Sequence, residues 1–266
     1  MINFKNQKVR YFELIKELAV TDFKLKFQGS VLGYLWSLVK PLMLFAVLYV
    51  VFTQFLKIGG NIDHYAVYLL LGVVFWGFFS ELTAGSLDSI VSRGDLIRKI
   101  YFPRIVLVLS RGITIFITFM LNLFAVFLFI IFTGVDIDLK ILFLPLIIIE
   151  LFILSLGVGL FLSSFFVKYR DIAHIWEIVL QALFYATPIL YPLSLVPSPY
   201  NKILLLNPVA QVIQDARYVM VTDQTTTAWN SLPLRFIWIP YVLPFIALIF
   251  GLIVFNKSAA KFAEEV

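Results

Sequence analysis

Six long apolar stretches constrain this chain more than any other feature of its sequence. They cover residues 35–56, 65–85, 105–133, 141–167, 173–196 and 235–256. A helix needs about 20 mainly apolar residues to cross the hydrocarbon core of a bilayer. We therefore expect one all-α integral membrane domain over residues 1–266, with six transmembrane helices.

The composition argues against a water-soluble helical fold. Hydrophobic residues make up 61% of the chain and charged residues only 14%, whereas soluble domains carry about 25% charged residues. A soluble protein of this length has no means of burying so much apolar surface, so lipid must be the solvent for most of the chain.

The basic residues predict the orientation of the spans. Fourteen Lys and Arg residues lie on the side of the termini and only five in the opposite connections, with Lys40 and Arg111 inside spans. Short cytoplasmic loops are enriched in Lys and Arg. This bias predicts a multi-pass protein with both termini in the cytoplasm.

Two segments outside the spans have helical rhythm. In residues 8–23, apolar residues recur on one side of a helix, at Tyr11, Phe12, Ile15, Leu18, Ala19 and Phe23. This pattern indicates an amphipathic helix at the cytoplasmic membrane interface, or one packed on another protein. Residues 201–221 are too short and too polar to span, and Pro208 interrupts them. They favour re-entrant helices on the outer side, between spans five and six.

The segment SRGDLIRKIYFPR, residues 92–104, lies between the second and third spans. Ser92 and Asp95 have capping-box spacing, Leu96, Ile97 and Ile100 form an apolar side, and Pro103 ends the helix. A short rigid helix on the cytoplasmic side offers a protruding surface to which a soluble partner can bind. A loop whose charges only fix the topology is the alternative.

Several stretches together resemble the membrane subunit of type-2 ABC exporters, in the branch that exports O-antigen, capsule and teichoic acid. They are LAVTDFKLKFQGSVLGYLWSLVKP (18–41), YLLLGVVFWGFF (68–79), GDLIRKIYFPR (94–104), VKYRDIAHIWEIVLQALFYATPILYPLSLVP (167–197) and LLLNPVAQVIQDARYVMV (204–221). They follow one another in the family's order across nearly the whole chain. Gly94-Asp95 departs from the Asn often found there, although Asp serves the same local capping role.

The resemblance implies a homodimer in the cytoplasmic (inner) membrane of a bacterium or archaeon, working with two copies of a cytoplasmic ABC ATPase. The chain has no G-x-x-x-x-G-K-[ST] phosphate loop, so we expect no cofactor on it, and ATP and Mg on the ATPase. By the same likeness, the segment that couples to the ATPase comprises Asp95, Leu96, Ile97, Arg98, Lys99, Tyr101, Phe102, Pro103 and Arg104. The cargo would be a lipid-linked polysaccharide or polyol-phosphate polymer.

Charged residues inside apolar stretches are costly and usually face protein or water. Lys40, Glu81, Arg111 and Glu177 lie near the predicted cytoplasmic ends of four spans. We hypothesise that they form ion pairs at the inner mouth of the pathway; snorkelling to the interface is the alternative. Glu150 lies deeper, and we interpret it as a helix–helix hydrogen-bonding group rather than a relay.

Aromatic residues make up 17% of the chain. Sugars pack their C–H faces on aromatic rings, so aromatic side chains suit a sliding polymer, although they also form interface belts and helix contacts. The candidates for lining the pathway are Tyr34, Trp36, Phe75, Trp76, Phe184, Tyr185 and Tyr191.

Other functions have less support. An exporter for a drug or small lipid would use the same machinery, with a narrower apolar pathway. A membrane-embedded transferase for lipid-linked sugars needs a cluster of carboxylates or histidines, and a passive channel needs no coupling helix. We find no catalytic or metal-binding motif, and the basic character indicates membrane orientation rather than nucleic acid.

Overall fold

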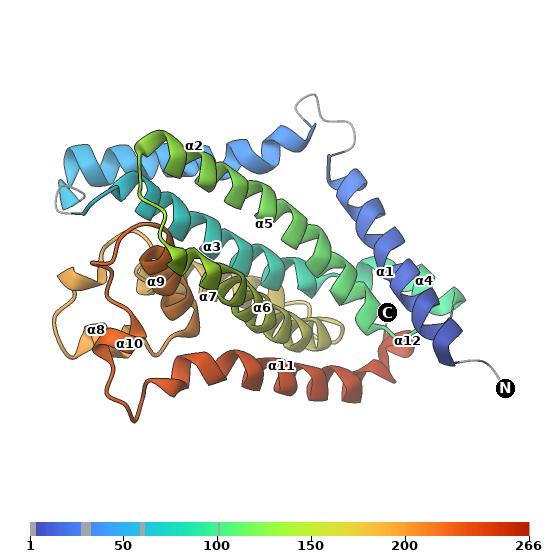
Figure 1. Cartoon of the computed structure of the whole chain (residues 1–266). Coiled ribbons are helices and arrows are strands. Elements are labelled where there is room, and N and C mark those ends of the chain that lie inside the picture. The colour runs from blue at the N-terminus through green and yellow to red at the C-terminus, as the bar shows by residue number, and fades with distance from the viewer. Residues whose placement is uncertain (1–3, 28–32, 59–61, 101, 266) are drawn as a thin grey trace.

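The protein is a bundle of helices in a computed structural model (Figure 1). The structure describes residues 4–27, 33–58, 62–100 and 102–265, with side chains placed for all of these except residues 4–10, 27, 34, 263 and 264. All regular structure in these ranges is helical. This confirms the all-α class.

Five helical segments are long and apolar enough to cross a membrane among the described residues. They are α2 (Trp36–Val50) with the π-helical turn η2 (Val51–Phe55), α3 (Tyr65–Leu87), α5 (Ile105–Thr133), η5 (Leu139–Phe143) with α6 (Leu144–Phe166), and α11 (Trp238–Ala259). Each coincides with a predicted span within a few residues. Apolar length therefore located these helices well.

The predicted fifth span, 173–196, differs from the structure. Helix α7 (Ile172–Ala186) has 15 residues and ends before Thr187. Pro188 and Pro192 follow, and proline supplies no backbone N–H to continue a helix. The remaining residues turn back toward the protein, with only a short 3-10 turn, η6 (Leu193–Leu195). Five candidate spans are therefore observed instead of six.

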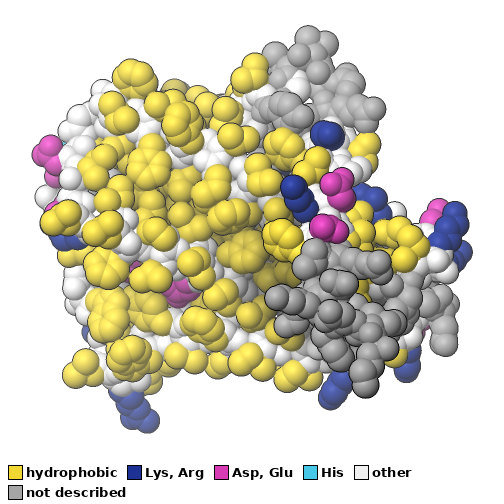
Figure 2. Space-filling view, turned by 45° about the vertical axis from the view of Figure 1, so that its right-hand side comes forward, with side chains coloured by type: hydrophobic (Ala, Val, Ile, Leu, Met, Phe, Trp, Pro, Cys, Tyr) yellow, Lys and Arg dark blue, Asp and Glu magenta, His cyan; other side chains and the backbone are white. Residues whose placement is uncertain are grey.

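Helix α3 forms the centre of the bundle. Most of its side chains are buried, and it packs against α5 and α6. Helices α6 and α11 approach closely where two glycines face each other: a Cβ on Gly251 would lie 2.2 Å from the carbonyl oxygen of Gly157. Small residues let membrane helices approach in this way. Figure 2 shows a broad hydrophobic face, with most charged side chains toward its edges.

The connection between α7 and α11 folds into short helices at one end of the bundle (Figure 1). These are α8 (Tyr200–Leu204), α9 (Pro208–Met220) and α10 (Ala228–Ser231). Asn207 caps α9 by accepting a 3.0 Å hydrogen bond from the amide of Val209, and Pro208 suits the first helical position. The predicted interruption at Pro208 is therefore the boundary between α8 and α9.

The opposite end carries α1 (Phe4–Phe27), the 3-10 turn η4 (Val91–Arg93), α4 (Gly94–Lys99) and α12 (Phe262–Glu265). Helix α1 is longer than the predicted 8–23 and crosses this end of the bundle, near both termini (Figure 1). Leu18 and Ala19, on the predicted apolar side, are buried within this chain, whereas Phe12 is 70% exposed. The apolar side of α1 therefore packs against α5, and Phe12 lies outside this buried contact.

Candidate functional site

An elongated hollow of about 890 Å³ lies between α2, α3, α5 and α7; we call it the aromatic groove. Trp36, Trp76 and Phe184 line it from three different helices. The rings of Trp76 and Phe184 meet edge to face at 5.9 Å. Asn122 of α5 also lines the groove and adds a polar amide to its wall.

The other candidate aromatics lie elsewhere. Phe75 is fully buried and packs against Phe119 with ring centroids 5.3 Å apart. Tyr185 is exposed, and the hydroxyl of Tyr191 donates a 3.2 Å hydrogen bond to its carbonyl oxygen. The side chain of Tyr34 lies outside the described residues. The six candidates with described side chains therefore divide between groove, core and surface.

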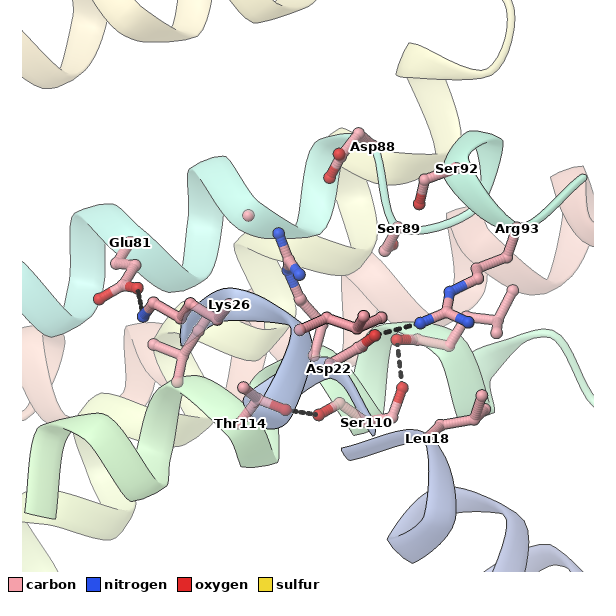
Figure 3. A pocket seen from close by; sticks show the side chains of 15 residues that line it. Leu18, Asp22, Lys26, Glu81, Asp88, Ser89, Ser92, Arg93, Ser110 and Thr114 are labelled. Atoms are coloured by element: carbon pink, nitrogen blue, oxygen red, sulfur yellow. Dashed lines mark hydrogen bonds and ion pairs between the residues drawn. The ribbon is translucent and has the colours of Figure 1, made fainter. Parts of the chain in front are cut away.

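A second hollow of about 520 Å³ lies between α1, the end of α3, η4 and the start of α5 (Figure 3); we call it the charged pocket. Its polar lining residues are Asp22, Lys26, Glu81, Asp88, Ser89, Ser92, Arg93, Ser110, Arg111 and Thr114. Leu18, Leu25, Leu107 and Ile115 complete the wall. The pocket thus combines charges, hydroxyls and an apolar side.

Helix α1 is tied to the bundle by two ion pairs in this pocket. Asp22 pairs with Arg93, and Lys26 Nζ donates to Glu81 Oε1 at 2.5 Å (Figure 3). Lys26 and Glu81 also line the aromatic groove. Their ion pair therefore lies at the boundary between the two hollows. The hydroxyl of Thr114 adds a 3.1 Å hydrogen bond to the carbonyl oxygen of Ala19.

The four predicted mouth charges do not pair with one another in the described residues. Glu81 pairs with Lys26 instead. Lys40 lines the aromatic groove and Arg111 the charged pocket, while Glu177 is exposed and lines neither. Three of the four charges therefore line the two hollows, and the partner of Glu81 is Lys26, which the hypothesis did not include.

Helix α4 is the core of the predicted coupling segment. It begins after Arg93, which has no side-chain capping bond, so the predicted Ser92–Asp95 capping box does not form. Ile97 and Phe102 are buried, whereas Ile100 is 56% exposed because the chain becomes extended there. Tyr101 lies outside the described residues.

The remaining coupling residues present a mixed surface. Asp95, Arg98, Lys99 and Pro103 are exposed, and Leu96 and Arg104 are partly buried. Behind them, Ile97 and Phe102 belong to one buried cluster with residues of α1, α5, α11 and α12, among them Leu18, Val106, Phe255 and Phe262. Helix α4 is therefore anchored to the ends of several helices.

Arg217 of α9 is fully buried and binds the backbone that follows the last residue of α7. It donates 2.6 Å hydrogen bonds to the carbonyl oxygens of Pro188 and Ile189, and a 3.1 Å bond to that of Tyr68. It also donates to Gln214 Oε1 at 3.1 Å. Non-helical backbone at membrane depth needs such partners because lipid offers none. Arg217 therefore allows α7 to end early.

A polar cluster joins α6, α9 and α11 on another side of α9. Gln211 Nε2 donates to Asp215 Oδ2 at 2.7 Å and lies 3.5 Å from Glu150 Oε2, and the Tyr241 hydroxyl donates to Asp215 at 2.8 Å. Burial raises the pKa of Asp215, opposed by these two hydrogen bonds. The position of Glu150 agrees with its interpretation as a helix–helix hydrogen-bonding group.

Sequence reasoning missed Asp22, Lys26 and Arg217 as functional positions. Asp22 and Lys26 are four residues apart, which places them on one helix face, but α1 extends beyond the predicted 8–23. Arg217 was counted as a charge of an outer connection. Its place within the apolar rhythm of 201–221 was the available signal that it points inward.

Comparison with known proteins identifies the class. The profile of the ABC-2 type transporter family matches residues 13–221, and the chain belongs to this family. It is therefore a membrane transport subunit and not an enzyme.

Particular relatives carry more specific names. The chain is 29% identical over 254 residues to an O-antigen export system permease protein RfbA of Klebsiella pneumoniae, covering 95% of both chains. It is 28% identical to RfbA of Myxococcus xanthus over 215 residues, which is 80% of this chain and 82% of the relative. It is 26% identical to the polysialic acid transport protein KpsM of Escherichia coli over 223 residues, with the same coverage.

Proposed function

We propose that this chain is the permease subunit of an ATP-driven exporter that moves a lipid-linked polysaccharide or polyol-phosphate polymer out of the cytoplasm. The observation that carries this proposal is the aromatic groove in a chain whose relatives are named as O-antigen and polysialic acid permeases. A sliding polymer needs many weak and interchangeable contacts. The half-exposed indole of Trp36 and the partly buried ring of Phe184 provide such contacts for sugar rings, with the buried Trp76 behind them.

The groove becomes a pathway in a homodimer. Helix α7 has no buried residue, and α2 has only Phe45. Both helices line the groove. Large apolar faces left uncovered in a membrane protein pack against lipid or another helix. In our proposal a second copy packs on this side, so that two grooves face each other.

ATP binding and hydrolysis take place on two copies of a separate ABC ATPase, where ATP and Mg are held. The exposed side of α4, with Asp95 and Lys99, docks on that subunit. Its buried side transmits the movement, because Ile97 and Phe102 pack in one cluster with Leu18 of α1. Movement of α1 then acts on the Lys26–Glu81 ion pair at the groove.

The proposed setting is the cytoplasmic membrane of a bacterium or archaeon, with both termini in the cytoplasm. Helix α7, continued by the buried backbone from Thr187 to Leu190, serves as the sixth crossing. Helix α1 lies at the level of the inner headgroups, where a lipid-linked substrate arrives.

The first experiment is deletion of this chain, followed by mass spectrometry of lipid-linked glycans on the cytoplasmic side of the membrane. We expect one polymer to accumulate and the intact protein to clear it. The double variant Arg98→Glu, Lys99→Glu should fold and fail to clear it, since the reversed charges meet the ATPase surface.

The matched control is Lys16→Glu, Glu17→Lys, which exchanges two exposed charges on α1 outside both hollows. This variant should clear the polymer. Unchanged glycans after deletion would overturn polymer export and direct attention to small-molecule efflux. Normal clearance by the α4 variant would overturn the docking role alone.

A further inference from the structure

Two side chains of opposite charge line the charged pocket without a partner among the described residues. The pocket is lined by three cationic and three anionic side chains, namely Lys26, Arg93, Arg111, Asp22, Glu81 and Asp88. Two ion pairs use four of these. Within the described part of the chain, the side chains of Arg111 and Asp88 make no ion pair or hydrogen bond.

These two groups lie along the same stretch of α3. A Cβ on Gly85 would be 3.5 Å from Arg111 Nε, so the Arg111 side chain passes over α3 at Gly85. Asp88 follows Gly85 by three residues, which is the spacing of one helix face. Arg111 and Asp88 are thus neighbours on one wall, yet their charged atoms are more than 4.0 Å apart.

The pocket lies at the end of candidate span α3 and beside the first turns of candidate span α5. Asp88 is the first residue after α3, and Arg111 is six residues into α5, about 9 Å along its axis. Ser89 and Ser92 add hydroxyl groups, whereas Leu25 of α1 is 54% exposed on the pocket wall. A polar hollow with an apolar side at this depth matches a molecule that has both a charged head and a hydrocarbon tail.

We propose that the charged pocket binds the headgroup of a bilayer aminophospholipid. The phosphate contacts the Arg111 guanidinium, which presents a fork of donors suited to phosphate oxygens. The primary ammonium contacts Asp88 and has three N–H donors to offer. The pocket carries balanced charge, and a zwitterion preserves that balance. This site goes beyond polymer export and does not depend on which cargo is moved.

Competing headgroups match the pocket less well. A phosphatidylglycerol headgroup brings a negative charge and leaves Asp88 without a cation, so the carboxylate repels it. A phosphatidylcholine headgroup carries a quaternary ammonium that has no N–H to donate to Asp88. The preference for a primary amine therefore rests on Asp88, and phosphate binding as such rests on Arg111.

The test is native mass spectrometry of the purified full chain in detergent with phosphatidylethanolamine and phosphatidylglycerol in equal amounts. We expect the protein to retain phosphatidylethanolamine about tenfold better, the effect of one charge-assisted hydrogen bond. Asp88→Asn should lose this preference and still bind lipid. Arg111→Gln should lose both lipids.

Two variants on α1 serve as controls. Lys24→Gln and Glu17→Gln remove exposed charges that do not line the pocket, and they should retain the wild-type preference. Equal binding of the two lipids by the wild type, or unchanged retention by Arg111→Gln, would overturn the proposal. Displacement of bound phosphatidylethanolamine by a short polyprenyl diphosphate at equal concentration would overturn it too, because the pocket would then belong to the lipid carrier of the substrate.

Discussion

The guanidinium carbon of Arg217 lies 3.5 Å from the centre of the Tyr68 ring. The two residues are 149 positions apart in sequence, and the same guanidinium group reaches the backbone that follows α7. One side chain therefore joins the central helix α3, helix α9 and the end of α7. Its charge is balanced by carbonyl dipoles and an aromatic face rather than by a carboxylate.

Arg217→Met should destabilise the protein strongly. Removal of the guanidinium leaves the carbonyl oxygens of Pro188 and Ile189 without this donor, at about 1–3 kcal/mol for each buried group. We expect a large fall in the thermal unfolding midpoint in detergent. The control Arg235→Met removes an exposed arginine of the same outer connection and should change stability by less than about 0.5 kcal/mol. Similar midpoints for the two variants would refute the role given to Arg217.

Gly72→Ala should disturb the same arrangement from α3. A Cβ at this position would lie 2.5 Å from Arg217 Nη2 and 3.1 Å from the carbonyl oxygen of Ile189. Overpacking of this kind costs about 1–3 kcal/mol. Gly77→Ala on the same helix meets nothing within 4 Å, and should leave the unfolding midpoint unchanged or raise it. Equal effects of the two alanines would show that the contact at Gly72 relaxes freely.

Exchange of the charges at Lys26 and Glu81 tests their ion pair. Each single reversal, Lys26→Glu or Glu81→Lys, places like charges together and should raise ATP hydrolysis uncoupled from transport. The double reversal should restore coupling, with an interaction free energy of about 0.2–1 kcal/mol because both side chains are partly exposed. Coupling is measured as the ratio of polymer moved to ATP hydrolysed. If the effects of the two single reversals simply add in the double variant, a direct role for the ion pair is excluded.

Two aromatic variants distinguish a residue that lines the aromatic groove from one that is buried in the core. Trp36→Ala removes a half-exposed ring that lines the aromatic groove, so transport should fall while the unfolding midpoint stays near that of the wild type. Phe75→Ala leaves a cavity in the core and should cost about 3–5 kcal/mol. Transport per folded molecule, measured together with the unfolding midpoint, distinguishes them. A loss of stability in Trp36→Ala without a transport defect would contradict the assignment of Trp36.

Local pattern was sufficient to predict the long helices and the helical structure of the two segments outside them. Apolar length alone placed α3, α5 and α11 within about three residues, because lipid requires every backbone group to bond inside its own helix. The existence of α4 followed from Pro103 and the apolar residues before it. The sequence did not predict the residue at which α4 begins, because the start of so short a helix depends on how its buried side packs against the bundle.

The contacts that define the site depend on the tertiary fold. Glu81 has several basic residues within reach of its end of the bundle, and only the path of α1 selects Lys26. The early end of α7 was not predicted because residues 173–196 remain mainly apolar on both sides of Pro188. What allows that end is a donor supplied by Arg217, 29 residues beyond Pro188.

The short length of α7 also has a consequence for the surrounding lipid. Its 15 residues rise about 22 Å, against about 30 Å for a typical hydrocarbon core. Helix α5, which borders the same groove, has 29 residues. A span that is too short thins the bilayer beside it. In the proposed topology, hydrophobic mismatch therefore thins the membrane on the α7 side of the groove, and an exported polymer that leaves there has the least hydrocarbon to cross.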